Sequence, residues 1–156
     1  EDLTVLTDSI RTFRDFRWRD LPGNLMPLDS TGMPWYAEAA ADMRLSSKNH
    51  ADIPVRLSDG RVLHVLASHP TPPAFDGPEK RNVARNHDEI RLWAEYLNDA
   101  PFLTDDAGRR GGLPDGALFV VVGDLNADPD EGNAQDAIAQ LLAHSRVQDA
   151  HPDRGS

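Results

Sequence analysis

The 156-residue sequence contains no cysteine and has few basic residues. The missing cysteine excludes disulfides, thiolate nucleophiles and cysteine-based zinc sites. Sixteen Lys and Arg residues stand against 26 Asp and Glu, which gives a formal charge of −10. Because this charge repels a polyphosphate, binding of nucleic acid through a basic surface is disfavoured unless bound cations invert the local field. Small or metal-bridged substrates fit the composition better.

Long hydrophobic runs are absent as well. No apolar run approaches the ~20 residues that span a bilayer, so no membrane-spanning segment is predicted. The first residues, Glu1-Asp2-Leu3-Thr4, do not resemble a signal peptide, and we interpret this N-terminus as trimmed. The compartment, secreted or cytoplasmic, and the oligomeric state stay open.

The length and composition predict one folding unit. A chain of this size corresponds to a single domain of roughly 100–200 residues or to part of one, so residues 1–156 are assigned to one domain. A hydrophobic content of 39% is enough for a core, while 12 prolines and 11 glycines indicate much ordered loop.

The clearest regular elements lie between residues 53 and 143. Two β-rich runs joined by Ser58-Asp59-Gly60 predict a hairpin. Helical spacing of apolar residues predicts two amphipathic helices, and an uninterrupted apolar run predicts a buried strand. The hairpin strands are Ile53–Leu57 and Val62–Ala67, the helices 79–97 and 133–143, and the buried strand Leu118–Val122.

The strongest chemical signal is the tetrapeptide Gly-Asp-Leu-Asn at 123–126, which directly follows the apolar strand. On an extended backbone Asp124 and Asn126 would project to the same side, about 7 Å apart. A carboxylate can bind a divalent cation or accept a proton from water, and an amide can donate to a phosphoryl oxygen. The alternative is that Asp124 only caps a turn.

A calcium-binding helix–loop–helix is a second alternative for this acidic segment. It fails because Pro129 stands where the loop needs glycine and Gln135 stands where it needs a bidentate glutamate. A strand also precedes the loop where a helix should.

His69 is the second candidate, since it follows the second hairpin strand and precedes a proline-rich turn. If the two strands share a sheet, its imidazole lies near Asp124 and can protonate a leaving oxygen. A purely structural or exposed histidine is the alternative. On the following helix Arg81, Asn82 and Arg85 are close in helical spacing and suit phosphate binding, with solvated charge as the alternative.

The strand-end histidine in Val65–Pro70, the Arg- and Asn-rich helix and Val120–Asn126 together resemble the endonuclease/exonuclease/phosphatase superfamily over about residues 44–143. This resemblance implies an α/β fold like that of deoxyribonuclease I, a β-sandwich of two mixed sheets flanked by helices. It also implies a magnesium-dependent attack of water on a phosphoester. By position, Asp124 is similar to the aspartate that orients or activates the water, Asn126 to the asparagine that holds the phosphate, and His69 to the histidine near the scissile bond.

The sequence departs from this family in its length. The family's metal-binding glutamate and its closing Ser-Asp-His motif are not identifiable, because Glu1 precedes no matching strand and His151 lacks a preceding apolar strand. A degenerate closing motif at Ala150-His151-Pro152 is the alternative. We therefore expect an incomplete form of the fold.

Three functions follow as expectations. The first is a metal-dependent hydrolase of small phosphomonoesters or phosphodiesters, with His69, Asp124 and Asn126 as catalytic residues and Arg81, Asn82 and Arg85 as substrate-binding residues. Asp124 and Asn126 are the expected ligands of Mg²⁺, with Mn²⁺ or Ca²⁺ as alternative ions. The second function is a magnesium-dependent endonuclease or exonuclease on DNA or RNA, and the third is a non-catalytic binding or structural fragment.

Overall fold

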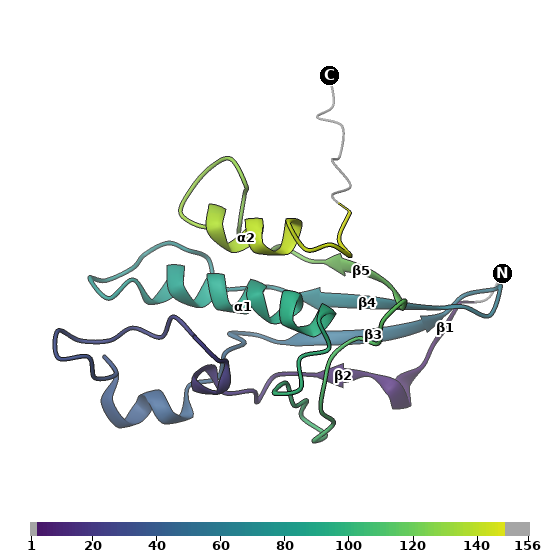
Figure 1. Cartoon of the computed structure of the whole chain (residues 1–156), viewed down its shortest axis with the longest axis horizontal. Helices are drawn as coiled ribbons and strands as arrows, with labels where there is room; N and C mark the ends of the chain where they lie inside the picture. The colour runs from purple at the N-terminus through teal and green to yellow at the C-terminus, as the bar shows by residue number, and fades with distance from the viewer. Residues whose placement is uncertain (1–2, 149–156) are drawn as a thin grey trace.

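The computed structural model describes residues 3–148 as a mixed α/β protein, so Glu1 and His151 lie outside the described residues. A five-stranded mixed sheet forms its centre (Figure 1). The strands are β1 Thr4–Val5, β2 Arg11–Thr12, β3 His50–Arg56, β4 Val62–Ser68 and β5 Leu118–Val122; the helices are α1 Arg81–Leu97 and α2 Gln135–Leu142, with 3-10 turns at Thr7–Ser9, Trp18–Asp20 and Ala37–Asp42. No helix of the described part has the length and apolarity to cross a membrane.

The predicted hairpin is confirmed as β3 and β4, which pair antiparallel from His50↔Ser68 to Arg56↔Val62. Gly60 has a φ of +86°, which an L side chain rarely adopts, so glycine is required in the turn. The two predicted helices are confirmed with slightly shorter bounds. Asp76, in the loop before α1, stabilises the first turn of the helix, because its carboxylate accepts the main-chain N–H groups of Asn82 and Val83.

The sheet order is β1-β3-β4-β5, and β2 pairs with β3 beside β1. Strands β4 and β5 are parallel, with Leu63 opposite Leu118 and Ala67 opposite Val122. Parallel neighbours need a crossover, which α1 supplies between them. Their carboxyl ends therefore meet at one edge of the sheet.

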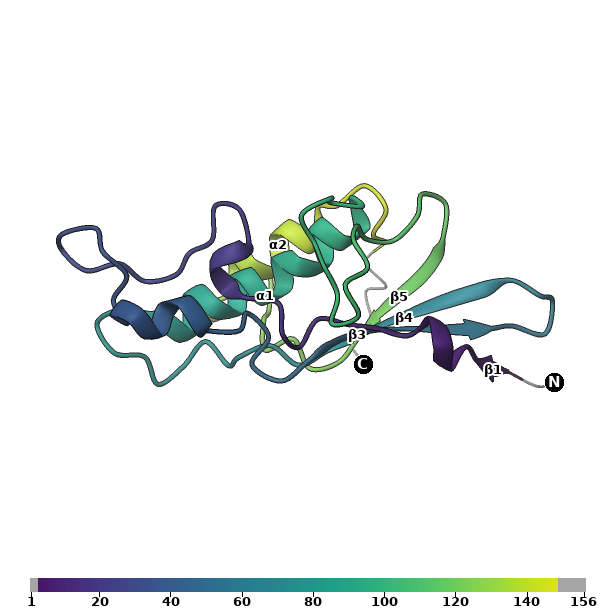
Figure 2. The same ribbon diagram turned by 90° about the horizontal axis from the view of Figure 1, so that it is seen from below.

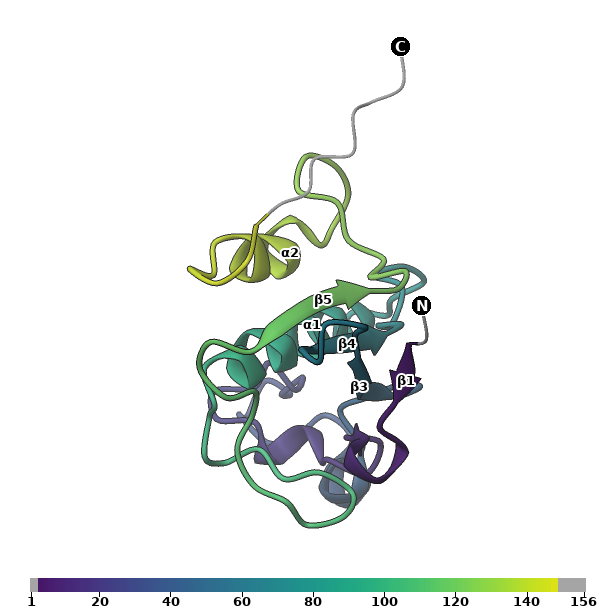
Figure 3. The ribbon, with the colours of Figure 1, turned by 90° about the vertical axis from the view of Figure 1, so that its right-hand side faces the viewer.

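Both helices lie on the same side of the sheet (Figures 2 and 3). The core there is built around aromatic side chains of α1 and the N-terminal segment. The Trp93 and Phe13 rings pack edge-to-face on Tyr96, with centroids 5.7 and 5.4 Å away, an arrangement that aromatic rings prefer. Leu66 of β4, fully buried, points into this core from the sheet.

The side of the sheet that faces away from the helices is here called the open face. Alternate residues of β5 lie on it, so the prediction that the whole run Leu118–Val122 is buried is wrong. Leu118, Val120 and Val122 are 41, 40 and 38% exposed. Residues directly opposite each other on paired strands share a face, so the registers define the open face completely. Its members are Thr12 and ten apolar residues: Val5, Ala51, Ile53, Val55, Leu63, Val65, Ala67, Leu118, Val120 and Val122.

Residues 3–148 contain one sheet and not the two of the expected sandwich. The apolar run of β5 is therefore not explained by burial on both faces of the strand, as was expected. One set of alternate residues packs on the helices, and the other set forms the open face.

Candidate active site

The candidate site lies where β4 and β5 end side by side. Ala67 pairs with Val122, so the two chains leave the sheet together and bring His69 and Asp124 to the same edge. Gly123 makes this approach possible. A methyl group at position 123 would lie 1.9 Å from the main-chain oxygen of Ser68, and the φ of +128° also suits only glycine.

His69 and Asp124 face each other at this edge. The His69 Nε2 and Asp124 Oδ2 atoms are 4.0 Å apart, and the two side chains are 49% and 70% exposed. Two groups at this separation can each reach one bound oxygen at a hydrogen-bond length of about 2.8 Å. The sequence-based prediction that two strands of one sheet bring these side chains together is confirmed.

Asn126 lies beside them, but in a different way from the one predicted. Strand β5 ends at Val122, and the Asn126 main-chain N–H turns back to Oδ1 of Asp124 at 3.0 Å. Asn126 adopts a φ of +51°, so the extended backbone assumed for Asp124 and Asn126 is wrong. A short polar side chain such as that of Asp124, which accepts the main-chain N–H two residues later, favours this turn. The Asn126 amide then donates from Nδ2 to the Pro70 carbonyl at 3.1 Å and ties the two loops together.

The predicted phosphate-binding residues of α1 have local partners. Arg85 donates from Nε to the Leu45 carbonyl at 2.9 Å and from Nη2 to that of Arg44, and burial lowers the pKa of its guanidinium. Asn82 donates to the Ala74 carbonyl at 2.7 Å. Arg81 donates to the Asn82 side chain and stacks over Tyr36, with 5.9 Å between its guanidinium carbon and the ring centroid. These contacts hold loops in place, and a phosphate role for the three residues stays a prediction.

Two buried polar residues of α1 contact the site's loops and were not among the predicted site residues. The Asn86 amide donates to the carbonyls of Thr71 and Leu125, and the Glu89 carboxylate accepts the N–H groups of Ser47 and Thr71. Both residues are 0% exposed. A signal was present in the sequence, because Asn86 lies three residues after Val83 and four before Ile90, within the apolar stripe of the helix.

The oxygen donors at the site suit a hard cation. Asp124 offers an exposed carboxylate, and Asn126 offers an amide oxygen. Mg²⁺ binds few protein carboxylates, keeps several waters and shares phosphate oxygens. Among the described residues no three His, Cys, Asp or Glu side chains converge on one metal position. A hard cation held by Asp124 and Asn126 would need its remaining ligands from water or from a bound molecule.

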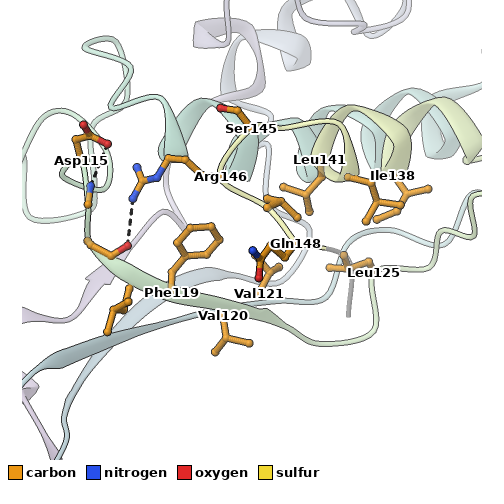
Figure 4. A pocket seen from close by; sticks show the side chains of 15 residues that line it. Asp115, Phe119, Val120, Val121, Leu125, Ile138, Leu141, Ser145, Arg146 and Gln148 are labelled. Carbon is orange, nitrogen blue, oxygen red and sulfur yellow. Dashed lines mark hydrogen bonds between the residues drawn. The ribbon is translucent and has the colours of Figure 1, made fainter. Parts of the chain in front are cut away.

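Two cavities lie near the site, one against the loop that begins at Asn126 and one along β5. The smaller, about 230 Å³, is lined by Pro73, Asn126, Asp128 and Glu131 among others, so its wall is acidic. The larger, about 690 Å³, lies between β5 and α2 and has a largely apolar wall (Figure 4). Its Arg146 guanidinium donates to main-chain carbonyls, including that of Ala117 at 3.2 Å. The larger cavity thus lacks a free cationic group for a phosphate.

Comparison of this chain with protein-family models, curated proteins and solved structures gives no match. A functional proposal therefore rests on the geometry of the site.

Proposed function

We propose that this chain carries the catalytic edge of a metal-dependent hydrolase of small phosphoesters. The observation that supports this most strongly is the pair His69 and Asp124, 4.0 Å apart and open to solvent at the ends of two adjacent parallel strands. In open α/β sheets, ligands bind outside the carboxyl ends of the strands. An imidazole and a carboxylate placed there form an acid–base couple.

The chemistry needs two proton transfers. A water oxygen attacks phosphorus, and the bond from phosphorus to the leaving oxygen breaks. The Asp124 carboxylate accepts a proton from the water, and protonated His69 gives a proton to the leaving oxygen. The Asn126 amide has a second N–H besides the one held by Pro70, and in this proposal that N–H donates to a phosphoryl oxygen. Each acid–base role contributes about 10²–10⁴-fold to the rate.

A divalent cation, Mg²⁺ with Mn²⁺ or Ca²⁺ as alternatives, would offset negative charge on the phosphate when bound. Asp124 and Asn126 are the residues that would hold it. The need for such a charge is clear from the surroundings, since the cavity beside Asn126 is lined by Asp128 and Glu131 and the chain carries a formal charge of −10. A bare phosphate would be repelled there.

The substrate class follows from the same charges. Arg85 donates hydrogen bonds to loop carbonyls, and Arg81 donates one to Asn82. These arginines therefore do not favour a continuous basic surface of the kind that binds a nucleic-acid backbone. A small phosphodiester or phosphomonoester is therefore favoured over long DNA or RNA.

The test compares three substrates in Mg²⁺ and in EDTA: bis-p-nitrophenyl phosphate, p-nitrophenyl phosphate and supercoiled plasmid. Magnesium-dependent release of nitrophenol without plasmid nicking supports the proposal. Efficient nicking would favour the nuclease alternative. Binding of Mg²⁺ and phosphate without turnover of any substrate would favour the non-catalytic alternative.

A further inference from the structure

Asn86 occupies a distinctive place in the molecule. It lies in the middle of α1, is 0% exposed, and reaches the two loops that follow β4 and β5. Its Nδ2 atom is 2.9 Å from the carbonyl oxygen of Thr71 and 3.0 Å from that of Leu125, with the Asn126 carbonyl at 3.4 Å. One buried amide group therefore bonds the loop that begins with His69 and the loop that contains Asp124.

Within residues 3–148, only one of the two polar atoms of the Asn86 amide is hydrogen-bonded, and this shows which atom contributes to stability. Asn86 Oδ1 is buried and has no partner in the described part of the chain. An unsatisfied buried acceptor costs about 1–3 kcal/mol, so the gain from this residue lies in its NH₂ group. Two N–H donors match two carbonyls on separate loops, and a hydroxyl or an apolar side chain could not satisfy both.

Other hydrogen bonds that join these loops directly come from less buried residues, such as the bond from Asn133 Nδ2 to the Pro73 carbonyl at 3.5 Å. Asn126 donates to Pro70 across the same gap, but it is itself part of one loop and is partly exposed. Asn86 is anchored in a 17-residue helix and surrounded by core. Its hydrogen bonds therefore attach both loops to the same residue of the helix.

We propose that Asn86 is a positioning residue that sets the separation of His69 and Asp124. The proposal rests on the proposed function of that pair, and it concerns geometry more than folding. A displacement near 1 Å between reacting groups costs roughly 10²-fold in rate. Loss of the Asn86 donors should therefore act mainly on kcat and not on the KM for substrate.

The experiment uses Asn86→Ala and Asn86→Ser, with Asn98→Ala as the matched control. Asn98 directly follows the last residue of the same helix, where its side chain contacts His144. The serine variant keeps a polar group and one donor, so it serves if the alanine variant fails to fold. With bis-p-nitrophenyl phosphate and Mg²⁺, we expect kcat to fall about 10–100-fold in the Asn86 variants and KM to stay within about threefold. Asn98→Ala should leave both unchanged.

A second measurement needs no turnover. The NMR resonance of the His69 imidazole is recorded before and after Asp124→Asn, and the change reports how closely the two side chains interact. In the Asn86 backgrounds this change should be reduced by at least half, and in Asn98→Ala it should be retained. An undiminished change, or an unaltered kcat in folded Asn86 variants, overturns the inference. A wild-type chain without turnover refutes the proposed function alone, because the NMR comparison still decides the role of Asn86.

Discussion

The His69 imidazole and the Asp124 carboxylate stand 4.0 Å apart although 55 positions separate them in sequence. Their approach depends on main-chain features more than on the side chains themselves. Parallel pairing of β4 with β5 aligns the strand ends, and Gly123 allows the backbone of β5 to pass the Ser68 carbonyl. The main chain of the sheet therefore brings the two side chains together.

The first prediction concerns the two catalytic candidates. Asp124→Asn removes the proton acceptor and His69→Gln removes the proton donor, so each should lower kcat for bis-p-nitrophenyl phosphate about 10²–10⁴-fold. Asp59→Asn, in the hairpin turn, is the control and should keep full activity. Turnover by Asp124→Asn at the wild-type rate would show that the assigned role of Asp124 is wrong.

The second prediction tests the close approach of the strands. Gly123→Ala should destabilise the chain by about 3 kcal/mol in urea unfolding, because it adds overpacking against Ser68 to the strain of a positive φ. Gly60→Ala is the matched control. Its φ is also positive but nothing lies within 4 Å of the added carbon, so a loss of only about 1 kcal/mol is expected. Equal losses for the two variants would argue against the contact.

The third prediction concerns Glu89. Its carboxylate accepts the N–H groups of Ser47 and Thr71, each at 2.6 Å, and is fully buried. Glu89→Gln places an NH₂ group against one of these donors, so the free energy of unfolding should fall by about 2–3 kcal/mol. Glu95→Gln on the same helix only weakens an ion pair with Arg91 near the surface, and about 0–1 kcal/mol is expected. Urea titrations of both variants check this, and a smaller loss for Glu89→Gln than for Glu95→Gln would contradict it.

Local patterns predicted the hairpin, both helices and β5 from the sequence. The juxtaposition of His69 and Asp124 was also predictable, because two apolar strands ending in polar residues meet at one edge when the strands are parallel neighbours. The turn at Asn126 was not. It depends on the side-chain bond from Asp124 and the contact with Pro70, and neither follows from the alternation of an extended chain.

Burial was the least predictable property. The run Leu118–Val122 is typical of a strand covered on both faces, but the described residues cover one. Arg85 is charged and was assigned to phosphate, but its guanidinium bonds loop carbonyls that lie 40 or more positions away in sequence. Long-range partners of this kind leave no periodic signal in a single sequence.

The fourth prediction is a pH dependence of stability from His50. This residue is fully buried, its Nδ1 accepts from the Ser46 hydroxyl at 2.6 Å, and its Nε2 donates to the Glu89 carbonyl at 2.8 Å. Burial lowers the pKa of His50 below its ordinary value of 6.5. The unfolded chain therefore binds more protons in acid, so the contribution is complete above pH 6.5 and is lost as the pH falls.

The measurement for His50 is urea unfolding between pH 5 and 8. His50→Gln keeps a donor toward Glu89 but cannot titrate, so the slope of stability against pH below 6.5 should be smaller by up to about 1.4 kcal/mol per pH unit. An equally steep slope in the variant would assign the acid sensitivity to other groups.

The last prediction compares the same substitution, leucine to alanine, on the two sides of the sheet. Leu66 points into the core and is 0% exposed, whereas Leu118 lies on the open face and is 41% exposed. Leu66→Ala should lower the free energy of unfolding by about 2–5 kcal/mol, because it leaves a cavity among packed residues. Leu118→Ala removes the same atoms from a half-solvated position, and a loss below about 1 kcal/mol is expected. Urea unfolding of both variants is the measurement. A loss at Leu118 as large as that at Leu66 would mean that, in solution, the open face is covered and Leu118 is as well packed as a core residue.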